Sequence, residues 1–258
     1  MSKAILIVSF GTSYEETRKK TIGAIEKDIA DAFSDTAKIY TAWTSRMIIS
    51  KLSKRGVKVN TVCEAMEQME KDGITDVIIQ PTHVINGTEY DLLKEDALKY
   101  AGRFSSLSFG RPLLTSKEDY EKIAEILSES FPKKAPQDTA YVLMGHGSDH
   151  YADPAYAALS WRLMDTGRPD IIIGTVESYP DIYAVIRAAR RYGAKKVILA
   201  PFMIVAGDHA NNDMAADEPS SWKSLFEEAG FEVSCVMKGL GEYPEVRKMF
   251  IDHIKDAI

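Results

Sequence analysis

Three residues with metal-binding side chains follow predicted strands in the second half of the chain. His146 lies between two glycines, Glu177 follows the next strand, and His209 comes two residues after Gly207. Two neutral imidazoles and a carboxylate suit a divalent metal such as cobalt, nickel, iron or zinc. Three protein ligands leave coordination positions open, as a metal that must be handed on requires. These residues therefore predict a metal site that exchanges its ion.

Other interpretations of the histidines and their neighbours stay open. A lone histidine commonly has a structural or surface role, which we expect for His150 and for His253, the latter on the solvent face of a C-terminal helix. His83 either lines the site or caps a strand. The segment 145–148 resembles a hydrolase oxyanion loop, but no Gly-x-Ser-x-Gly motif accompanies it. No Gly-x-Gly-x-x-Gly or Walker A motif supports nucleotide binding.

Short apolar runs rich in Val and Ile alternate with segments of helical periodicity. The predicted strands are 4–10, 37–43, 76–80, 107–109, 140–144, 171–176, 196–200 and 231–237. The predicted helices include 15–33, 61–71, 89–100, 120–128 and 180–192. This alternation is typical of an α/β fold with parallel strands and helices on both faces. Ligands of such sheets bind beyond the carboxyl ends of the strands, where the two histidines and Glu177 are expected.

Several helix boundaries carry capping signals. Ser13–Glu16 and Thr61–Glu64 have the spacing of a capping box. Asp153–Pro154 is typical of an N-cap followed by proline in the first turn. Gly193 stands where a helix should end before the next strand.

The two halves of the chain resemble each other. Segment 7–12 is similar to 143–148, and 77–81 is similar to 197–201, which aligns Phe10 with His146 and Glu89 with His209. We predict two similar lobes, 1–131 and 138–258, joined by a linker that contains proline and lysine. Each lobe should hold a four-stranded parallel sheet flanked by helices, with the active site in the cleft between the lobes and the metal-binding histidines in the second lobe.

Composition limits the classes of function. The chain has 258 residues and a net charge of −6, which disfavours nucleic acid as a partner. Cys63 and Cys235 form neither a disulfide framework nor a CxxC metal motif. No apolar run is long enough for a membrane span, and no signal-peptide pattern is present. We therefore expect a soluble, cytoplasmic protein with no membrane partner.

Six segments together resemble the anaerobic cobaltochelatase family of cobalamin biosynthesis, class II chelatases with a fold related to that of ferrochelatase. The matching segments are 8–13, 44–49, 83–90, 144–147, 176–180 and 205–215. The resemblance extends over nearly the whole chain. One residue departs from it, because Arg46 stands where the family pattern has a small residue such as glycine.

The resemblance implies that cobalt(II) is inserted into sirohydrochlorin, with release of two protons, in the oxygen-independent cobalamin route. It makes His146 and His209 the metal-binding and catalytic histidines and Glu177 the third metal ligand. Glu89 is similar to the acidic residue that handles protons. Cobalt(II) is then a substrate, and no prosthetic group is expected.

The substrate carries carboxylates, so local cations must hold it on an acidic protein. The candidates, chosen because they follow predicted strand ends in the first half, are Arg18, Arg46, Lys51 and Arg55. Plain surface solvation is the alternative for these four cations. Phe10 and Met203 are candidates for lining the faces of the macrocycle, with core packing as their alternative.

Three alternatives remain at this level. The chain could be a nickel or iron chelatase acting on a related tetrapyrrole, since intrinsic metal preference separates these metals poorly. It could bind a tetrapyrrole or a metal on the same scaffold without catalysis, or bind another small ligand between its lobes. The oligomeric state, a homo-oligomer included, is open because amphipathic helix faces such as 120–128 fit either an interface or solvent.

Overall fold

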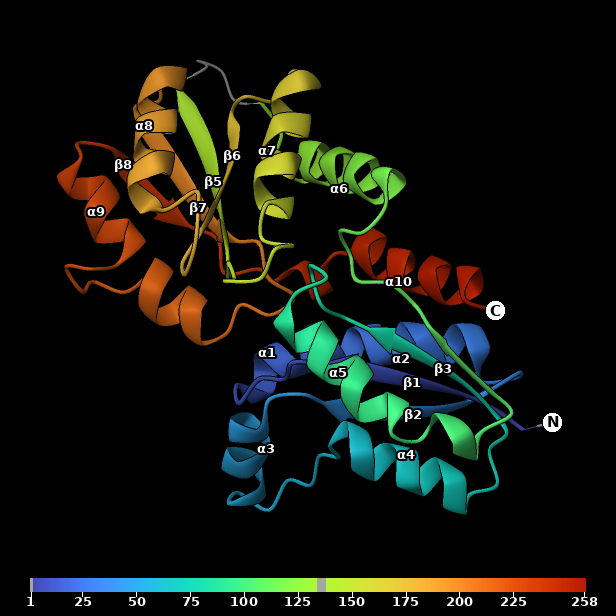
Figure 1. Ribbon diagram of the computed structural model, residues 1–258. Helices are drawn as coiled ribbons and strands as arrows, with labels where there is room; N and C mark the ends of the chain where they lie inside the picture. The colour runs from blue at the N-terminus through green and yellow to red at the C-terminus, as the bar shows by residue number, and fades with distance from the viewer. Residues whose placement is uncertain (1, 134–137) are drawn as a thin grey trace. The chain divides into compact units, whose positions relative to one another are not determined.

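A computed structural model describes residues 2–133 and 138–258. The chain divides into two compact units, each built on one sheet (Figure 1). Unit 1 consists of Met1–Thr115 and Gly241–Ile258, and unit 2 of Ser116–Leu240. Both sheets are four-stranded and parallel and are flanked by helices, which confirms the predicted α/β architecture.

Unit 1 contains the first four strands in the order β2-β1-β3-β4. The strands are β1 (Lys3–Ser9), β2 (Lys38–Trp43), β3 (Asp76–Pro81) and β4 (Ser106–Phe109). Its helices are α1 (Glu15–Lys20), α2 (Ile22–Phe33), α3 (Arg46–Ser53), α4 (Val62–Lys71), α5 (Thr88–Leu98), the 3-10 turn Ala101–Arg103 and α10 (Pro244–Asp256). Met66 of α4 and Leu93 of α5 share a core with Leu6 of β1 on one face of the sheet. Helix α2 packs against β2, and α10 packs against α2 and β3.

Unit 2 contains the other four strands in the order β6-β5-β7-β8. The strands are β5 (Thr139–Gly145), β6 (Ile171–Thr175), β7 (Lys196–Pro201) and β8 (Glu232–Cys235). Its helices are α6 (Lys117–Ser130), α7 (Ala155–Asp165), α8 (Ile182–Tyr192), a π-helix η2 (Ala210–Met214) and α9 (Trp222–Glu228), and the 3-10 turn η3 (Leu240–Glu242) follows. All 7 residues of β5 are buried, because helices cover both faces of a parallel sheet.

The two sheets repeat the same strand register. Val8 of β1 pairs with Pro81 of β3, and Met144 of β5 pairs with Pro201 of β7. The backbone leaves the sheet in the same way in both units, since Thr82 N–H donates to Val8 O and Phe202 N–H donates to Met144 O. The similarity between the halves of the sequence thus corresponds to a repeated fold.

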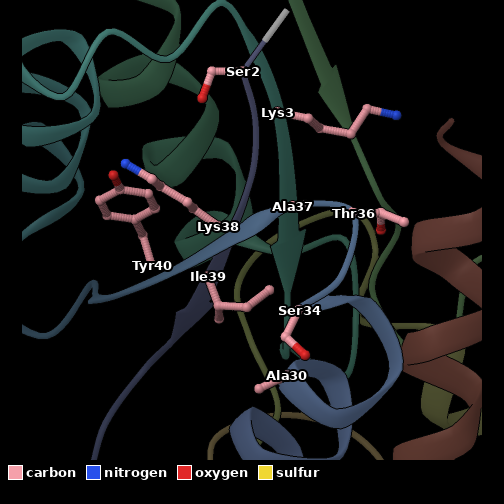
Figure 2. A pocket seen from close by; sticks show the side chains of 9 residues that line it. All are labelled: Ser2, Lys3, Ala30, Ser34, Thr36, Ala37, Lys38, Ile39 and Tyr40. Atoms are coloured by element: carbon pink, nitrogen blue, oxygen red, sulfur yellow. The ribbon is translucent and has the colours of Figure 1, made fainter.

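A hollow of about 790 Å³ lies in unit 1 at the amino ends of β1 and β2 (Figure 2). Lys3, Lys38 and Tyr40 are among its lining residues. It holds none of the predicted site residues and lies at the edge of the sheet opposite to the carboxyl ends of the strands. No helix in the described part of the chain is both long enough and apolar enough to cross a membrane.

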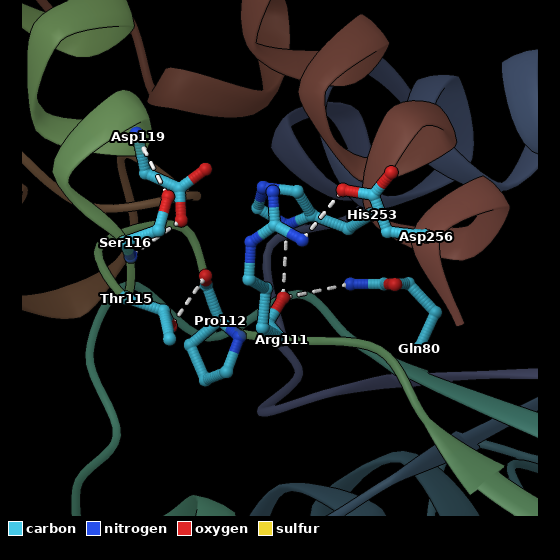
Figure 3. Close-up of polar contacts among 8 residues, drawn as sticks. All are labelled: Gln80, Arg111, Pro112, Thr115, Ser116, Asp119, His253 and Asp256. Atoms are coloured by element: carbon cyan, nitrogen blue, oxygen red, sulfur yellow. Dashed lines mark hydrogen bonds and ion pairs between the residues drawn. The ribbon is translucent and has the colours of Figure 1, made fainter.

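The C-terminal helix belongs to unit 1, which differs from the predicted lobe boundaries of 1–131 and 138–258. Figure 3 shows the cause: the carbonyl of Arg111 accepts hydrogen bonds from Gln80 Nε2 at 3.1 Å and from His253 Nδ1 of α10 at 3.0 Å. Arg111 also pairs with Asp256 at 2.7 Å. His253 is only 2% exposed, so the expectation that it faces solvent is wrong.

The N-terminal boundary of unit 2 also differs from the prediction. Helix α6 lies in unit 2 and packs against α7, so the predicted first lobe extends too far. Ser116 and Asp119 form a reciprocal capping box at its start (Figure 3). Of the predicted linker, residues 134–137 lie outside the described residues.

The capping predictions had mixed outcomes. The capping box of Thr61 and Glu64 is present, and Gly193 ends α8 in the left-handed conformation with φ +88°. The predicted helix 15–33 is two helices, because Thr21 leaves helical geometry and its hydroxyl donates to Thr17 O at 2.7 Å. Tyr14, not Ser13, is the N-cap of α1, and no side chain caps it.

Candidate metal site

His146, Glu177 and His209 converge in unit 2. His146 follows β5, Glu177 follows β6, and His209 precedes the π-helix η2. One ligand atom from each residue lies within 4.8 Å of the others. The imidazole rings meet edge to face, with centroids 4.7 Å apart and planes at 88°. All three side chains are partly exposed, so an ion could reach them from solvent.

Asp213 of the π-helix orients His209. Its Oδ2 lies 2.8 Å from Nδ1 of His209. A carboxylate only accepts hydrogen bonds, so Nδ1 carries the proton and donates it. The lone pair of Nε2 is then available to a metal, an arrangement common for metal-binding histidines.

The ring of His146 is oriented by its own loop. Nδ1 lies 2.8 Å from Gly147 O and 3.6 Å from Glu177 Oε2. With Nδ1 donating to Gly147 O, the lone pair of Nε2 of His146 is also available. The carboxylate of Glu177 therefore lies beside the imidazole and near the proposed metal position.

A buried tyrosine supports the loop that carries His146. A Cβ on Gly145 would lie 2.5 Å from a ring carbon of Tyr156, so only glycine lets the strand end this close to the ring. Burial raises the pKa of Tyr156, and backbone groups of Gly147 and His146 oppose that rise. The phenol thus stays protonated and packs beneath the loop.

Comparison with known proteins assigns the chain to a family. It matches the cobalt chelatase (CbiK) family over residues 3–258. It is 41% identical to a sirohydrochlorin cobaltochelatase of Salmonella typhimurium, over 100% of this chain and 97% of that protein. It is 31% identical to sirohydrochlorin cobaltochelatase CbiKC of Nitratidesulfovibrio vulgaris, over 99% of this chain and 90% of that protein.

The chain belongs to the cobalt chelatase family.

Solved structures of other chelatases share the fold of this cobalt chelatase. SirB from Bacillus subtilis with Fe3+ matches with a TM-score of 0.67 and 15% identity, over 100% of this chain and 96% of that chain. A structure of the sirohydrochlorin chelatase SirB from Bacillus subtilis subspecies spizizenii in complex with cobalt matches with a TM-score of 0.65 and 15% identity, over 100% and 95% of the two chains. The predicted chelatase-like fold is confirmed.

Unit 1 repeats the backbone that carries His146, Glu177 and His209 but has other residues at these positions. The sheet register and loop lengths place Phe10, Ser45 and Glu89 at the positions equivalent to His146, Glu177 and His209. Ser45 N–H donates to Phe10 O at 3.2 Å, as Glu177 N–H donates to His146 O at 2.9 Å. The equivalence of Phe10 and His146 was predicted from sequence, and that of Ser45 and Glu177 follows only from the register.

The other predicted site residues of unit 1 lie at the carboxyl edge of its sheet or in the first turn of a following helix. Glu89 is partly buried in the first turn of α5, and Arg46 is the exposed first residue of α3. Phe10 follows β1 and is 43% exposed, so it is available to a ligand. The structure describes these residues within unit 1, and their roles stay predictions.

A cationic face covers α3 and the turn after it. Between residues 44 and 63 the chain carries cations and no carboxylate; the cations are Arg46, Lys51, Lys54, Arg55 and Lys58. Among the described residues none of these five forms an ion pair, whereas many of the other lysines and arginines do. Arg55 Nη1 donates to Ser13 O at 3.2 Å, which ties this face to the loop that follows β1.

Two remaining candidates are placed as follows. His83 does not cap a strand, because neither ring nitrogen has a hydrogen-bond partner among the described residues. Burial lowers the pKa of His83 to about 4, so its ring is neutral near pH 7. Met203 is partly buried and packs against the core of unit 2, and its contact with substrate stays a prediction.

Proposed function

We propose that this chain inserts cobalt(II) into sirohydrochlorin, as a step of anaerobic cobalamin biosynthesis. The observation that carries the proposal is the cluster of His146, Glu177 and His209, with ligand atoms within 4.8 Å of one another. The cluster lies in a chain that is 41% identical, end to end, to a sirohydrochlorin cobaltochelatase. Cobalt(II) is a substrate of the reaction and leaves with the product.

The donor set favours delivery over storage. Imidazole nitrogen and carboxylate oxygen bind cobalt(II) without the tight grip of thiolates. Three protein ligands leave open coordination positions on the metal. Pyrrole nitrogens of the macrocycle can bind there first, and the protein ligands can then be released one at a time. Partial exposure of all three side chains supports both entry of the ion and approach of a large substrate.

Charge and protons balance during insertion. Each cobalt(II) that enters the macrocycle displaces two pyrrole protons, and no electron is transferred. An imidazole or carboxylate that gives up the metal regains a free lone pair and can accept a proton. His146 and His209 thus serve first as ligands and then as bases, and Asp213 stabilises the imidazolium of His209 through their hydrogen bond. We assign Glu89 a share of this proton transfer from its family resemblance.

The cationic face of α3 fits the carboxylates of the substrate. Its cations have no intramolecular ion pairs in the described chain, so binding a polyanion requires no existing pair to break. Phe10 and Met47, 43% and 77% exposed, offer apolar surface beside them for a flat macrocycle. Arg46 directly precedes Met47, is exposed, and is our first choice for a carboxylate contact.

The test is an anaerobic insertion assay with purified protein, sirohydrochlorin and cobalt(II). We expect the absorption spectrum to change to that of the cobalt complex at a rate that depends on enzyme concentration. His146→Ala and His209→Ala should each lose most of this activity, because each removes a ligand. Full activity in both variants would contradict the site, and enzyme-independent rates would contradict the function.

A third histidine gives the matched control. His150 lies in the same loop region outside the cluster, and its Nδ1 accepts a hydrogen bond from Ala152 N–H at 3.2 Å. His150→Asn keeps an acceptor at that position and should retain wild-type activity. Parallel assays with nickel(II) and iron(II) rank the metals in the same protein.

A further inference from the structure

We propose that Asp153 is a positioning residue that sets the separation of His146 and Glu177. The inference rests on the proposed function, because it assumes that these two side chains bind cobalt(II) together. Nothing in the sequence pattern suggests the role, since Asp153 was predicted to cap a helix. Helix α7 instead begins at Ala155 with Pro154 at the N-cap and no side-chain cap.

The carboxylate of Asp153 joins the two loops that carry these ligands. Its Oδ1 accepts a hydrogen bond from Ser148 N–H at 2.8 Å, two residues after His146. Its Oδ2 accepts one from Ser178 Oγ at 2.7 Å, one residue after Glu177. Each oxygen therefore holds one loop, and the carboxylate fixes the distance between them.

The loops are already in backbone contact where Asp153 joins them. Glu177 N–H donates to His146 O at 2.9 Å. A Cβ on Gly147 would lie 2.9 Å from Ser178 N, so the two loops are packed too closely for any residue other than glycine at position 147. The two hydrogen bonds of Asp153 add to this contact and oppose movement of one loop relative to the other.

Asp153 acts through the ligands and is not a ligand itself. It is 8% exposed, and both of its oxygens are directed to donors in the loops. A buried carboxylate is retained only where hydrogen bonds compensate its desolvation. Two short bonds to the two ligand loops supply that compensation, which ties the burial of Asp153 to the geometry of the metal site.

The experiment measures cobalt(II) affinity of the full chain without tetrapyrrole, by competition with a coloured chelator. Asp153→Ala should weaken binding by about tenfold or more, the usual range for a residue that positions metal ligands. Asp153→Asn should bind more tightly than Asp153→Ala, because the amide oxygen still accepts from Ser148 N–H and the amide nitrogen can donate to Ser178 Oγ. Ser178→Ala removes one of the two bonds and should give a smaller loss.

Asp119 provides the matched control. It is a buried aspartate of the same unit, 3% exposed, and its Oδ2 accepts from Ser116 N–H at 2.8 Å. It lies on α6, which carries none of the three ligands. Asp119→Ala should lower the unfolding temperature and leave cobalt(II) affinity unchanged.

A double-mutant cycle with Glu177→Ala separates positioning from general stability. If Asp153 acts by placing Glu177 beside His146, its removal should weaken binding much less once Glu177 is gone. Equal losses in both backgrounds, or no loss in Asp153→Ala and Ser178→Ala, would overturn the inference. If His146→Ala also leaves cobalt(II) affinity unchanged, the metal site itself is wrong. The proposed function fails only if insertion does not depend on enzyme, so the failures are distinguishable. If Asp153→Ala does not fold, Ser178→Ala takes its place in the cycle.

Discussion

At the scale of single residues, neighbouring groups orient the two histidines that we propose as metal ligands. Asp213 fixes the proton of His209 on Nδ1, and Gly147 O does the same for His146. These contacts leave both Nε2 atoms available and remove the rotational freedom that a ligand would otherwise lose on binding. Affinity for cobalt(II) should therefore depend on these neighbours as well as on the ligands.

Asp213 gives a prediction at this scale. Asp213→Ala should weaken cobalt(II) binding by about 10- to 100-fold, because His209 loses the acceptor that fixes its ring. The measurement is a cobalt(II) titration of the folded variant. Asp217→Ala is the control, since Asp217 is exposed and pairs with Lys223 away from the ligands. Equal affinities in the two variants would show that Asp213 has no orienting role.

Gly147 gives a second prediction. Gly147→Ala places a Cβ 2.9 Å from Ser178 N at a φ of +85°, so it should separate the loops of His146 and Glu177. We expect loss of cobalt(II) affinity and a stability loss of about 1–3 kcal/mol, measured by thermal unfolding.

Gly167 isolates the effect of the backbone angle. It has a φ of +78° and nothing within 4 Å of an added Cβ. Gly167→Ala should lose about 1–2 kcal/mol of stability from backbone strain alone and keep full affinity. Normal cobalt(II) binding in Gly147→Ala would contradict close loop packing as a condition for the site.

At the scale of elements, the proposed substrate contacts and the proposed metal ligands lie on different parts of the chain. Its cations belong to unit 1, whereas the three ligands belong to unit 2. The two properties should therefore respond to different substitutions. If the cationic face of α3 binds the substrate as proposed, a chain with a net charge of −6 can still attract a polycarboxylate locally.

Charge reversal on α3 tests this separation. Lys51→Glu and Arg46→Glu should each raise the KM for sirohydrochlorin by about tenfold, because each places a negative charge where the substrate carboxylates bind. The assay is run at low salt, since salt screens exposed charges. Cobalt(II) affinity should stay unchanged. Lys38→Glu is the control, a cation at the opposite edge of the same sheet. Equal effects of all three variants would mean that only net charge matters.

Helix α2 carries a carboxyl that should oppose folding above neutral pH. Burial raises the pKa of Glu26 from 4.5 to about 7, and Arg18 offsets part of that rise. Between these values the folded state binds more protons than the unfolded state, so stability falls as pH rises. Glu26→Gln should be more stable than the wild type by about 1–3 kcal/mol at pH 8, with most of this gain gone at pH 5.

Denaturant unfolding at the two pH values measures the effect of Glu26. Glu129→Gln, at an exposed position of α6, should leave stability unchanged at both. A gain in Glu26→Gln that is the same at pH 5 and pH 8 would contradict burial of the carboxyl as its cause.

At the scale of the whole molecule, the repeat was predictable and the unit boundaries were not. Period and spacing identify the strands, and the similarity between the halves predicts two equivalent sheets. The convergence of His146, Glu177 and His209 could be predicted because residues after parallel strands meet at one edge of a sheet. Helix α10 could not be placed, because nothing local in 244–256 shows that His253 bonds to Arg111 in the first unit.

The residues missed from the sequence are those with two plausible local roles. Asp153 before Pro154 fits an N-cap, and only the fold shows that its carboxylate joins two loops instead. Asp213 did leave a signal, since it lies four residues after His209 and such pairs meet on one helical face. Ser45 has no chemical signal, and only the strand register shows its equivalence to Glu177.

The most direct test of the central claim is the position of cobalt in a crystal of the wild-type protein soaked with cobalt(II), located by anomalous diffraction at the cobalt edge. We predict an anomalous peak within bonding distance of one imidazole nitrogen each of His146 and His209 and of a carboxylate oxygen of Glu177, absent from His146→Ala crystals. A peak of comparable occupancy elsewhere on the chain, with none at these three residues, would contradict the assignment of the metal site.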